Sequence, residues 1–305
     1  MTATRGRPER MRPLVEAALA DPGVAEMVVV VDGEDQVATW EELGALARSH
    51  PRLVPLRVPR RGQLAAMDAG VARAGSEVLV LLDDDIVAGP ALGTAHARHH
   101  AARAGLVVVG AMPVDLAGAS IGTILYARDY EQYRARLRAG QWAVLDHLWL
   151  GNVSLRRADA LAVGLCSEHF GPAYHSDREL GFRLADAGLV GVFDESLAAT
   201  HVHVRPDAGF VRDALGRGAG LVRLHQLHPA RTGPFPLDAL LAEVPRPLRG
   251  AVRRLGRSAA ATPAARLLLG MARVCRVLHW WRGEVAAAQV ARRLLFARGA
   301  ATAPG

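Results

Sequence analysis

Hydrophobic runs of strand length recur along the first two thirds of the chain, with helical segments between them. The runs are EMVVVV (26–31), EVLVLL (77–82), GLVVVG (105–110) and GLVGVF (188–193). Residues 61–75 carry apolar side chains at helical spacing and end at Gly75. Continuous apolar strands that alternate with helices predict an α/β fold, a mostly parallel sheet flanked by helices on both faces.

Acidic residues follow two of these strands. Asp32 ends the first run, and Asp83, Asp84 and Asp85 end the second. Ligands of such sheets bind beyond the carboxyl ends of the strands. Adjacent carboxylates repel one another, and hard cations such as Mg²⁺ or Mn²⁺ prefer oxygen ligands. The triplet therefore indicates a cation site, with a solvated acidic turn as an equally good explanation of the triplet alone.

Two later segments carry further candidates. In HSDRELGFRLADAG (175–188), Ser176 and Glu179 have capping-box spacing, so Asp177 lies at a helix start. There it either complements the helix dipole or serves as a general base. In ATHVHVRP (199–206), His201 and His203 share a face if the segment is a strand, and either could complete an Asp/His metal site or simply be packed. HARHH (96–100) is predicted to form a polar helix face.

Composition narrows the class of partner. The chain is 50% hydrophobic and 22% charged, with a formal charge of +7 carried entirely by arginine. The arginines are scattered until the C-terminal part, which favours an anionic ligand or a membrane surface, and we expect no nucleic-acid partner. Two isolated cysteines, Cys166 and Cys275, exclude a disulfide scaffold. With no secretory signal and no apolar run of spanning length, the sequence predicts a cytoplasmic protein.

The amino-acid composition of the sequence changes near residue 228. Pro-rich breaks are followed by Arg-rich amphipathic stretches, including RLLLGMARVCRVLHWW. We therefore expect a main domain over residues 1–228, and a Pro-rich linker with a helical tail over residues 229–305. The tail either contacts a membrane peripherally or packs on the main domain as a lid.

Six segments, taken together, resemble a known family. They are TRGRPERM (4–11), VVVVDGEDQ (28–36), RRGQLAAMDAG (60–70), LLDDDIV (81–87), WLGNVSLRR (149–157) and HSDRELGFRL (175–184). Their order and wording resemble the motifs of family 2 glycosyltransferases over about residues 1–225. The resemblance implies the Rossmann-like GT-A fold and an inverting transfer from a nucleotide-diphosphate sugar, with Mn²⁺ or Mg²⁺ on the diphosphate.

The resemblance also implies residue roles. Asp177 would be the catalytic base. The donor would be bound by Thr4, Asp32, Gly62, Asp83 and Asp84. The metal would be held by Asp85 with Asp83 and with His201 or His203. Asn152 and Ser176 would lie on the acceptor side. Trp142 and Trp149, beside the Gly-Asn segment, either stack on an acceptor sugar on that side or belong to the core. UDP-sugars are the family's commonest donors, and the acceptor would be a hydroxyl of a glycan, a lipid-linked sugar or a small molecule.

Some features depart from the family pattern. Gly33 follows Asp32 directly, Asp68 replaces the usual Asn, and only Met1–Ala3 precede Thr4, where the family has a longer first strand. We expect from this that the native protein begins upstream. The alternatives are a nucleotidyltransferase-like enzyme, which normally shows a Lys-containing Gly-rich loop, and a non-catalytic sugar-nucleotide-binding protein.

Overall fold

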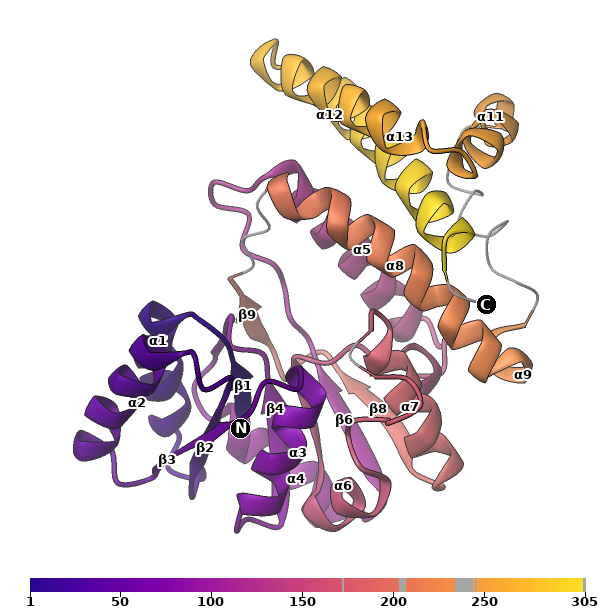
Figure 1. Ribbon diagram of the computed structural model, residues 1–305. Helices are drawn as coiled ribbons and strands as arrows, with labels where there is room; N and C mark the ends of the chain where they lie inside the picture. Colours follow the sequence, from indigo (N-terminus) through magenta and orange to yellow (C-terminus); the bar gives the residue numbers. More distant parts are fainter. Residues whose placement is uncertain (172, 203–206, 234–243, 245, 304–305) are drawn as a thin grey trace. The chain divides into compact units, whose positions relative to one another are not determined.

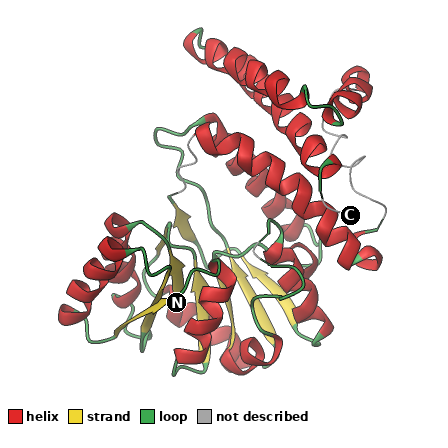
Figure 2. Ribbon diagram, viewed as in Figure 1, coloured by secondary structure: helices red, strands yellow, loops and turns green. Residues whose placement is uncertain are grey.

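The computed structural model describes residues 1–171, 173–202, 207–233, 244 and 246–303. The chain forms two compact units. Unit 1 comprises Met1–Asp115, Tyr130–Pro172 and Ser176–His203, and unit 2 comprises Leu116–Asp129, Ala173–His175 and Val204–Gly305. Unit 1 has the predicted α/β architecture, and unit 2 is helical in its described part (Figures 1 and 2).

The strands and helices of unit 1 follow the expected alternation. Its strands are β1 (Thr2–Thr4), β2 (Met27–Asp32), β3 (Leu53–Val58), β4 (Val78–Leu82), β5 (Ile86–Ala88), β6 (Leu106–Gly110), β7 (Asn152–Arg156), β8 (Val190–Asp194) and β9 (Ala199–His201). Its helices are α1 (Pro8–Leu19), α2 (Val37–Ser49), α3 (Gln63–Arg73), α4 (Leu92–Ala102), the short 3-10 helix η1 (Leu145–His147), α6 (Arg157–Val163) and α7 (Ser176–Asp186). The strands predicted near residues 26, 77, 105 and 188 are confirmed.

The sheet is mostly parallel, with one reversed strand. β1, β2 and β3 pair in parallel, as do β6 and β8, whereas β7 is antiparallel to both β4 and β6. Met1 connects the two parts of the sheet: Leu82 N donates to Met1 O at 2.9 Å, and the Met1 amino group donates to Val80 O at 2.7 Å. The orders β1-β2-β3 and β4-β7-β6-β8 therefore join at Met1 into the order β3-β2-β1-β4-β7-β6-β8, and Figure 1 labels each of these strands except β7. Whether residues precede Met1 stays a prediction.

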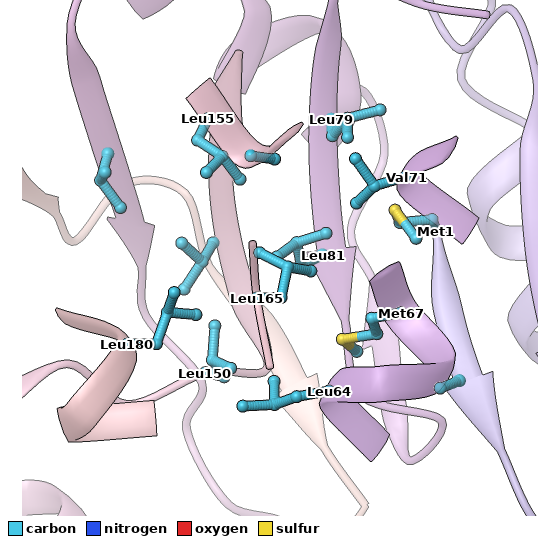
Figure 3. Close-up of a cluster of buried hydrophobic side chains, with 14 of the residues drawn as sticks. Met1, Leu64, Met67, Val71, Leu79, Leu81, Leu150, Leu155, Leu165 and Leu180 are labelled. Atoms are coloured by element: carbon cyan, nitrogen blue, oxygen red, sulfur yellow. The ribbon is translucent and has the colours of Figure 1, made fainter. Parts of the chain in front are cut away.

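Both faces of β2 are buried, which explains its unbroken apolar sequence. Val28 and Val30 belong to one core cluster, and Val29 and Val31 to another on the opposite face. The first cluster also holds Met1 together with side chains of α3, β4 and β7, as the close-up in Figure 3 shows. Covering both faces leaves the strand ends as the place for polar groups.

Unit 2 contains the start of α5 (Ile121–Arg138) together with α8, α9, α11, α12 and α13. These last five span Asp207–Leu227, Pro229–Thr232, Arg246–Gly256, Ala261–Val277 and Trp281–Ala301. α8 and α13 pack through Gly218 and Gly299, because a Cβ at either position would collide with a backbone carbonyl of the partner helix. Arg292 on α13 makes a two-pronged ion pair with Asp129 on α5, at 2.6 and 2.9 Å.

The division of the chain differs from the boundary expected at residue 228. Unit 2 takes in residues 204–228 because α8 packs along α13, and it also takes in the 116–129 segment from the middle of the chain. The change in composition does not reveal that α8 belongs to unit 2, because α8 precedes the Pro-rich breaks. The two cysteines are free, as expected. Within the described ranges, every helix is too short or too polar to cross a membrane.

Candidate functional site

A polar pocket lies at the carboxyl ends of β1, β2 and β4. Its volume is about 340 Å³. It is lined by Ala3, Thr4, Arg5, Arg7, Asp32, Gln63, Asp83, Asp84 and Asp85. The predicted meeting of Asp32 with the acidic triplet at one edge of the sheet is therefore confirmed.

A second cavity of about 360 Å³ lies toward the opposite ends of β2 and β4. It is lined in part by Met1, Val24, Met27 and Val78. The carboxylates at its edge are already occupied with backbone amides: Asp21 accepts from Thr94 N at 2.8 Å and Glu26 from Gly75 N at 2.6 Å. The pocket with the acidic triplet is the better site, because its charged groups converge where such sheets bind ligands.

Asp32 fixes one wall of the pocket. Its carboxylate accepts hydrogen bonds from the backbone N–H of Arg61 at 2.7 Å and of Gly62 at 3.1 Å, just before α3 begins. Gly62 has φ of +95°, a conformation that side chains rarely adopt, and this lets the chain turn its amides toward the carboxylate. Asp32 thus stabilises the helix start while lining the pocket. Its predicted contact with a nucleotide base stays a prediction.

The three carboxylates of the triplet have different partners. Asp83 accepts from Gln63 Nε2 at 2.6 Å, and Asp84 accepts from Thr4 Oγ1 at 2.8 Å. Arg7 lies between Asp84 and Asp85, with its NH1 atom 2.5 Å from Asp84 Oδ1 and 3.3 Å from Asp85 Oδ2. Arg10 approaches Asp85 at 3.6 Å. The cations that compensate this cluster in the structure are therefore arginines, which the sequence analysis did not single out.

His201 reaches the triplet through a two-stranded ribbon. β5 and β9 are antiparallel with Ile86 opposite His201, and Val202 N donates to Asp85 O at 2.8 Å. This register brings His201 Nε2 to 3.0 Å from Asp85 Oδ1, with the imidazole only 3% exposed. His201 is therefore the histidine that meets the acidic residues. His203, the other candidate, lies outside the described residues.

Asp83, Asp85 and His201 form a group suited to a metal ion. One ligand atom of each lies within 4.8 Å of the others. Two carboxylates and an imidazole form a donor set that suits Mn²⁺ and that Mg²⁺ also accepts through its oxygens. Such an ion would leave coordination positions for ligand oxygens and water.

The electrostatics of the cluster also favour a cation. Burial, and then the charge of Asp85, raises the pKa of Asp83 to about 6, against an opposing effect of His201. Burial also raises the pKa of Asp84, opposed by Arg7. Burial lowers the pKa of Arg7, but Asp84 and Asp85 together outweigh it and raise that pKa. Carboxylates crowded in this way gain from any further positive charge placed among them.

Asp177 belongs to a second group of residues around η1 and α7. Asp177 lies in the first turn of α7, and its Oδ1 accepts from Arg178 N at 2.9 Å. Its charge acts on Tyr133, whose pKa is raised chiefly by burial and also by Tyr130 and Asp177. Tyr133 in turn lies 5.4 Å, centroid to centroid, from the ring of Trp149. Tyr133 thus feels the charge of Asp177 and packs against Trp149, and neither Asp177 nor Trp149 is among the residues that line the pocket.

Aromatic rings surround this second group. Trp149 meets Tyr130 edge-on at 5.4 Å, and Trp142 stacks on His147 at 3.9 Å with an interplanar angle of 11°. Trp142 and Trp149 are partly buried against the core. They combine a packing role with some remaining exposure. Ser176, the first residue of α7, is also partly exposed.

Asn152, expected on the acceptor side, is fully buried behind the pocket. Its amide nitrogen donates to Leu197 O at 2.8 Å and to Ala111 O at 3.2 Å. Its amide oxygen is therefore the acceptor for His96 Nε2 at 2.9 Å. Asn152 pairs with Leu82 across β4 and β7, so these bonds brace β7, the neighbour of the strand that delivers the triplet.

The prediction that HARHH forms a polar helix face is wrong. His96 and His100 are both fully buried on α4. His96 Nδ1 and His100 Nε2 each lie 2.8 Å from Ser154 Oγ. Because the neutral His96 ring donates from Nε2 to Asn152, its Nδ1 accepts a hydrogen bond from the Ser154 hydroxyl. His100 Nε2 in turn donates to Ser154 Oγ. Burial, only partly opposed by the hydrogen bond to Asn152, lowers the pKa of His96 to about 4. The signal that could have found them is their i, i+4 spacing behind Leu92, which puts all three on one face.

Comparisons with known proteins agree with this arrangement. Residues 1–152 match the family model described as Glycosyl transferase family 2. The chain is similar to the mannosyltransferase PcManGT from Pyrobaculum calidifontis, solved in complex with GDP-Man and Mn²⁺, with a TM-score of 0.60, 17% identity, and 95% of this chain and 84% of that chain covered. At that identity the likeness shows a shared fold alone. No curated protein matches the chain significantly.

The family match spans the strands that build the pocket. It runs from Met1, at the junction of the sheet, through the acidic triplet to Asn152 on β7. Fold, pocket and family model thus agree independently over the same residues. The chain is a glycosyltransferase with the GT-A fold and belongs to glycosyltransferase family 2.

Proposed function

We propose that the protein transfers a sugar from a nucleotide-diphosphate donor to an acceptor hydroxyl, with inversion at the anomeric carbon. The observation that carries the proposal is the convergence of Asp83, Asp85 and His201 at a pocket lined by Thr4 and Asp32. Carboxylates gathered this closely need a cation, and the pocket beside them is open to a polar ligand.

The donor is proposed to bind through both parts of this pocket. Asp83, Asp85 and His201 would hold Mn²⁺ or Mg²⁺. The ion, when bound, offsets charge on the leaving diphosphate. Thr4, Asp32, Gly62 and Asp84 would contact the nucleoside and ribose. Arg7 and Arg10, whose guanidinium groups face the same carboxylates, are then available to pair with phosphate oxygens.

Asp177 is proposed to take the proton of the acceptor hydroxyl. The hydroxyl oxygen attacks the anomeric carbon, the bond from that carbon to the diphosphate breaks with its electron pair, and the proton passes to the carboxylate. A position in the first turn of α7 favours the ionised form of Asp177. Trp149 would stack on the acceptor sugar and Ser176 would lie beside it, while Asn152 would act indirectly by bracing β7.

The next point is which nucleotide carries the donor sugar. UDP-sugars are the family's commonest donors, and the neighbour solved with GDP-Man adds guanosine sugars to the candidates. The acceptor would be a hydroxyl of a glycan, a lipid-linked sugar or a small molecule. We place the reaction in the cytoplasm, where sugar nucleotides are made.

Thermal shift with UDP, GDP, TDP and CDP, each with and without Mn²⁺, tests the donor site. A ligand that binds only the folded state raises the melting temperature by mass action. We expect a Mn²⁺-dependent shift with one nucleotide, lost in Asp85→Asn. Asp35→Asn is the matched control, because Asp35 is 60% exposed and lies outside the proposed metal group. A shift that ignores Mn²⁺, or that survives Asp85→Asn, contradicts the proposed metal site.

Product analysis separates the three candidate functions. A sugar transferase releases nucleoside diphosphate, a nucleotidyltransferase releases or consumes pyrophosphate, and a binding protein releases neither. The decisive variant is Asp177→Asn, which should keep the thermal shift and lose turnover. Asp186→Asn, an exposed position at the other end of α7, is its control. Turnover that persists in Asp177→Asn would rule out Asp177 as the base.

A further inference from the structure

Helix α12 has two apolar faces, and only one of them is covered. Ala261, Ala265 and Ala272 are buried, and α12 packs along α13, beside which it runs in Figure 1. Leu267 and Met271 lie on the other apolar face, which is open to solvent, with 70% and 52% of their surfaces exposed. Val274 and Leu278 continue the same stripe, since positions i, i+4, i+7 and i+11 fall on one side of a helix.

The stripe ends in exposed aromatic rings at the turn between α12 and α13. Trp280 and Trp281 are 59% and 63% exposed. We call Leu267, Met271, Val274, Leu278, Trp280 and Trp281 the hairpin face. The large exposed apolar side chains of the other described parts are spread along residues 37–248, whereas these six fall within residues 267–281. A contiguous exposed apolar surface of this kind marks an interaction site.

Arginines flank the hairpin face on its own helix and turn. Residues 261–283, from the start of α12 to the turn into α13, contain four arginines and neither aspartate nor glutamate. Arg266 and Arg273 are exposed and lie about 100° around the helix from the stripe. Arg282 lies beside Trp281, its guanidinium carbon 5.9 Å from the ring centroid. The face therefore combines aliphatic side chains, indole rings and cations. The next acidic residue along the chain, Glu284, is buried and pairs with Arg276 at 2.6 Å.

That combination fits one partner best. Aliphatic side chains gain from hydrocarbon, indoles prefer the interface between hydrocarbon and water, and arginines are attracted to anionic headgroups. A nucleic acid would use the arginines but not the Leu, Met and Val stripe. A second copy joined through the same face would set arginine against arginine.

We propose that the hairpin face binds the surface of an anionic phospholipid bilayer. α12, about 25 Å long at 1.5 Å per residue, lies along the interface and immerses its stripe rather than crossing the membrane. This surface consists of unit 2 residues alone, so the inference does not rest on the transfer reaction. Of the two roles expected for the tail, membrane contact and a lid on the main domain, the proposal assigns membrane contact to the exposed face of α12.

Flotation of the full-length protein with vesicles tests the proposal. We expect binding to phosphatidylcholine vesicles to rise as phosphatidylglycerol is added. Replacing Leu267 and Met271 by Gln should weaken binding at least tenfold, since each side chain loses its place in the apolar layer. Replacing Arg266 and Arg273 by Gln should weaken binding to the anionic vesicles by roughly 30-fold and reduce its dependence on their charge, although Arg276 and Arg282 remain.

The controls separate membrane binding from folding and from self-association. Leu161→Gln with Val37→Gln removes two exposed apolar side chains of unit 1 and should not change flotation. Melting curves and the nucleotide thermal shift, measured on every variant, report folding and donor binding independently. Flotation equal with neutral and anionic vesicles, or unchanged by the Leu267 and Met271 replacements, overturns the proposal. So does sedimentation showing a dimer that these replacements dissociate, without flotation of the original protein.

Discussion

Acid should destabilise this protein through the buried imidazole of His96. The pKa of His96 is lowered from 6.5 to about 4 in the folded chain, because the ring is buried and the hydrogen bond to Asn152 offsets this only in part. In the unfolded chain His96 takes up a proton as the pH falls below 6.5, whereas in the folded chain it does so only near pH 4. Stability is therefore full above about pH 6.5 and is lost as the pH falls toward 4.

The size of the effect follows from the two pKa values. At pH 5 the unfolded chain is mostly protonated at this site and the folded chain is mostly not, which gives a loss of about 2 kcal/mol from His96 alone. Carboxylates titrate in the same range, so the measurement is a difference between variants. His96→Gln keeps an amide that can bond to Ser154 and Asn152 but cannot take up the proton.

Urea unfolding at pH 7 and pH 5 measures this difference. The original protein should lose about 2 kcal/mol more than His96→Gln between the two pH values. His169→Gln, at an exposed position, controls for the loss of one imidazole and should follow the original protein. If His96→Gln shows the same acid loss as the original protein, the buried neutral tautomer assigned to His96 is wrong.

Three further changes have defined outcomes. Asp177→Asn should lower kcat by about 10²- to 10⁴-fold with the donor Kd unchanged, measured by steady-state kinetics and calorimetry; a raised Kd would instead place Asp177 at the donor. Arg7→Ala removes a cation that faces two carboxylates and should tighten Mn²⁺ binding without nucleotide by about fivefold in titration calorimetry, whereas weaker binding would make Arg7 a support of the metal site. Gly181→Ala sets a Cβ against Leu145 O and should cost about 1–3 kcal/mol in urea unfolding, while Gly44→Ala, with open space around it, should not destabilise; equal effects would contradict the packing of α7 on η1.

Much of the catalytic fold could be predicted from the chain because its signals are local. An unbroken run such as VVVV in β2 occurs where both faces of a strand are covered, and a carboxylate after such a strand falls at the ligand-binding edge. Asp32 and Asp83 were found in this way. The helix that begins at Ser176 was found from its capping spacing and its terminal Gly188.

The errors occurred where burial depends on distant contacts. The histidines of α4 look polar in the sequence, but they are buried because Ser154 and Asn152 on β7 offer them hydrogen bonds. The compact units divide the chain elsewhere than at residue 228, because α8 packs on α13, far along the chain, while the domain boundary itself stays a prediction. Neither contact leaves a trace in local composition.

The sequence by itself determined the class of fold, the strands that end in carboxylates and the family, because hydrophobic period and motif order are properties of neighbouring residues. Only the tertiary structure decided which groups share the site. The register of β5 with β9 selects His201 as the partner of Asp85, and the start of α1 places Arg7 and Arg10 against the triplet. It also decided which face of α12 is exposed, since both faces are apolar and only packing against α13 tells them apart.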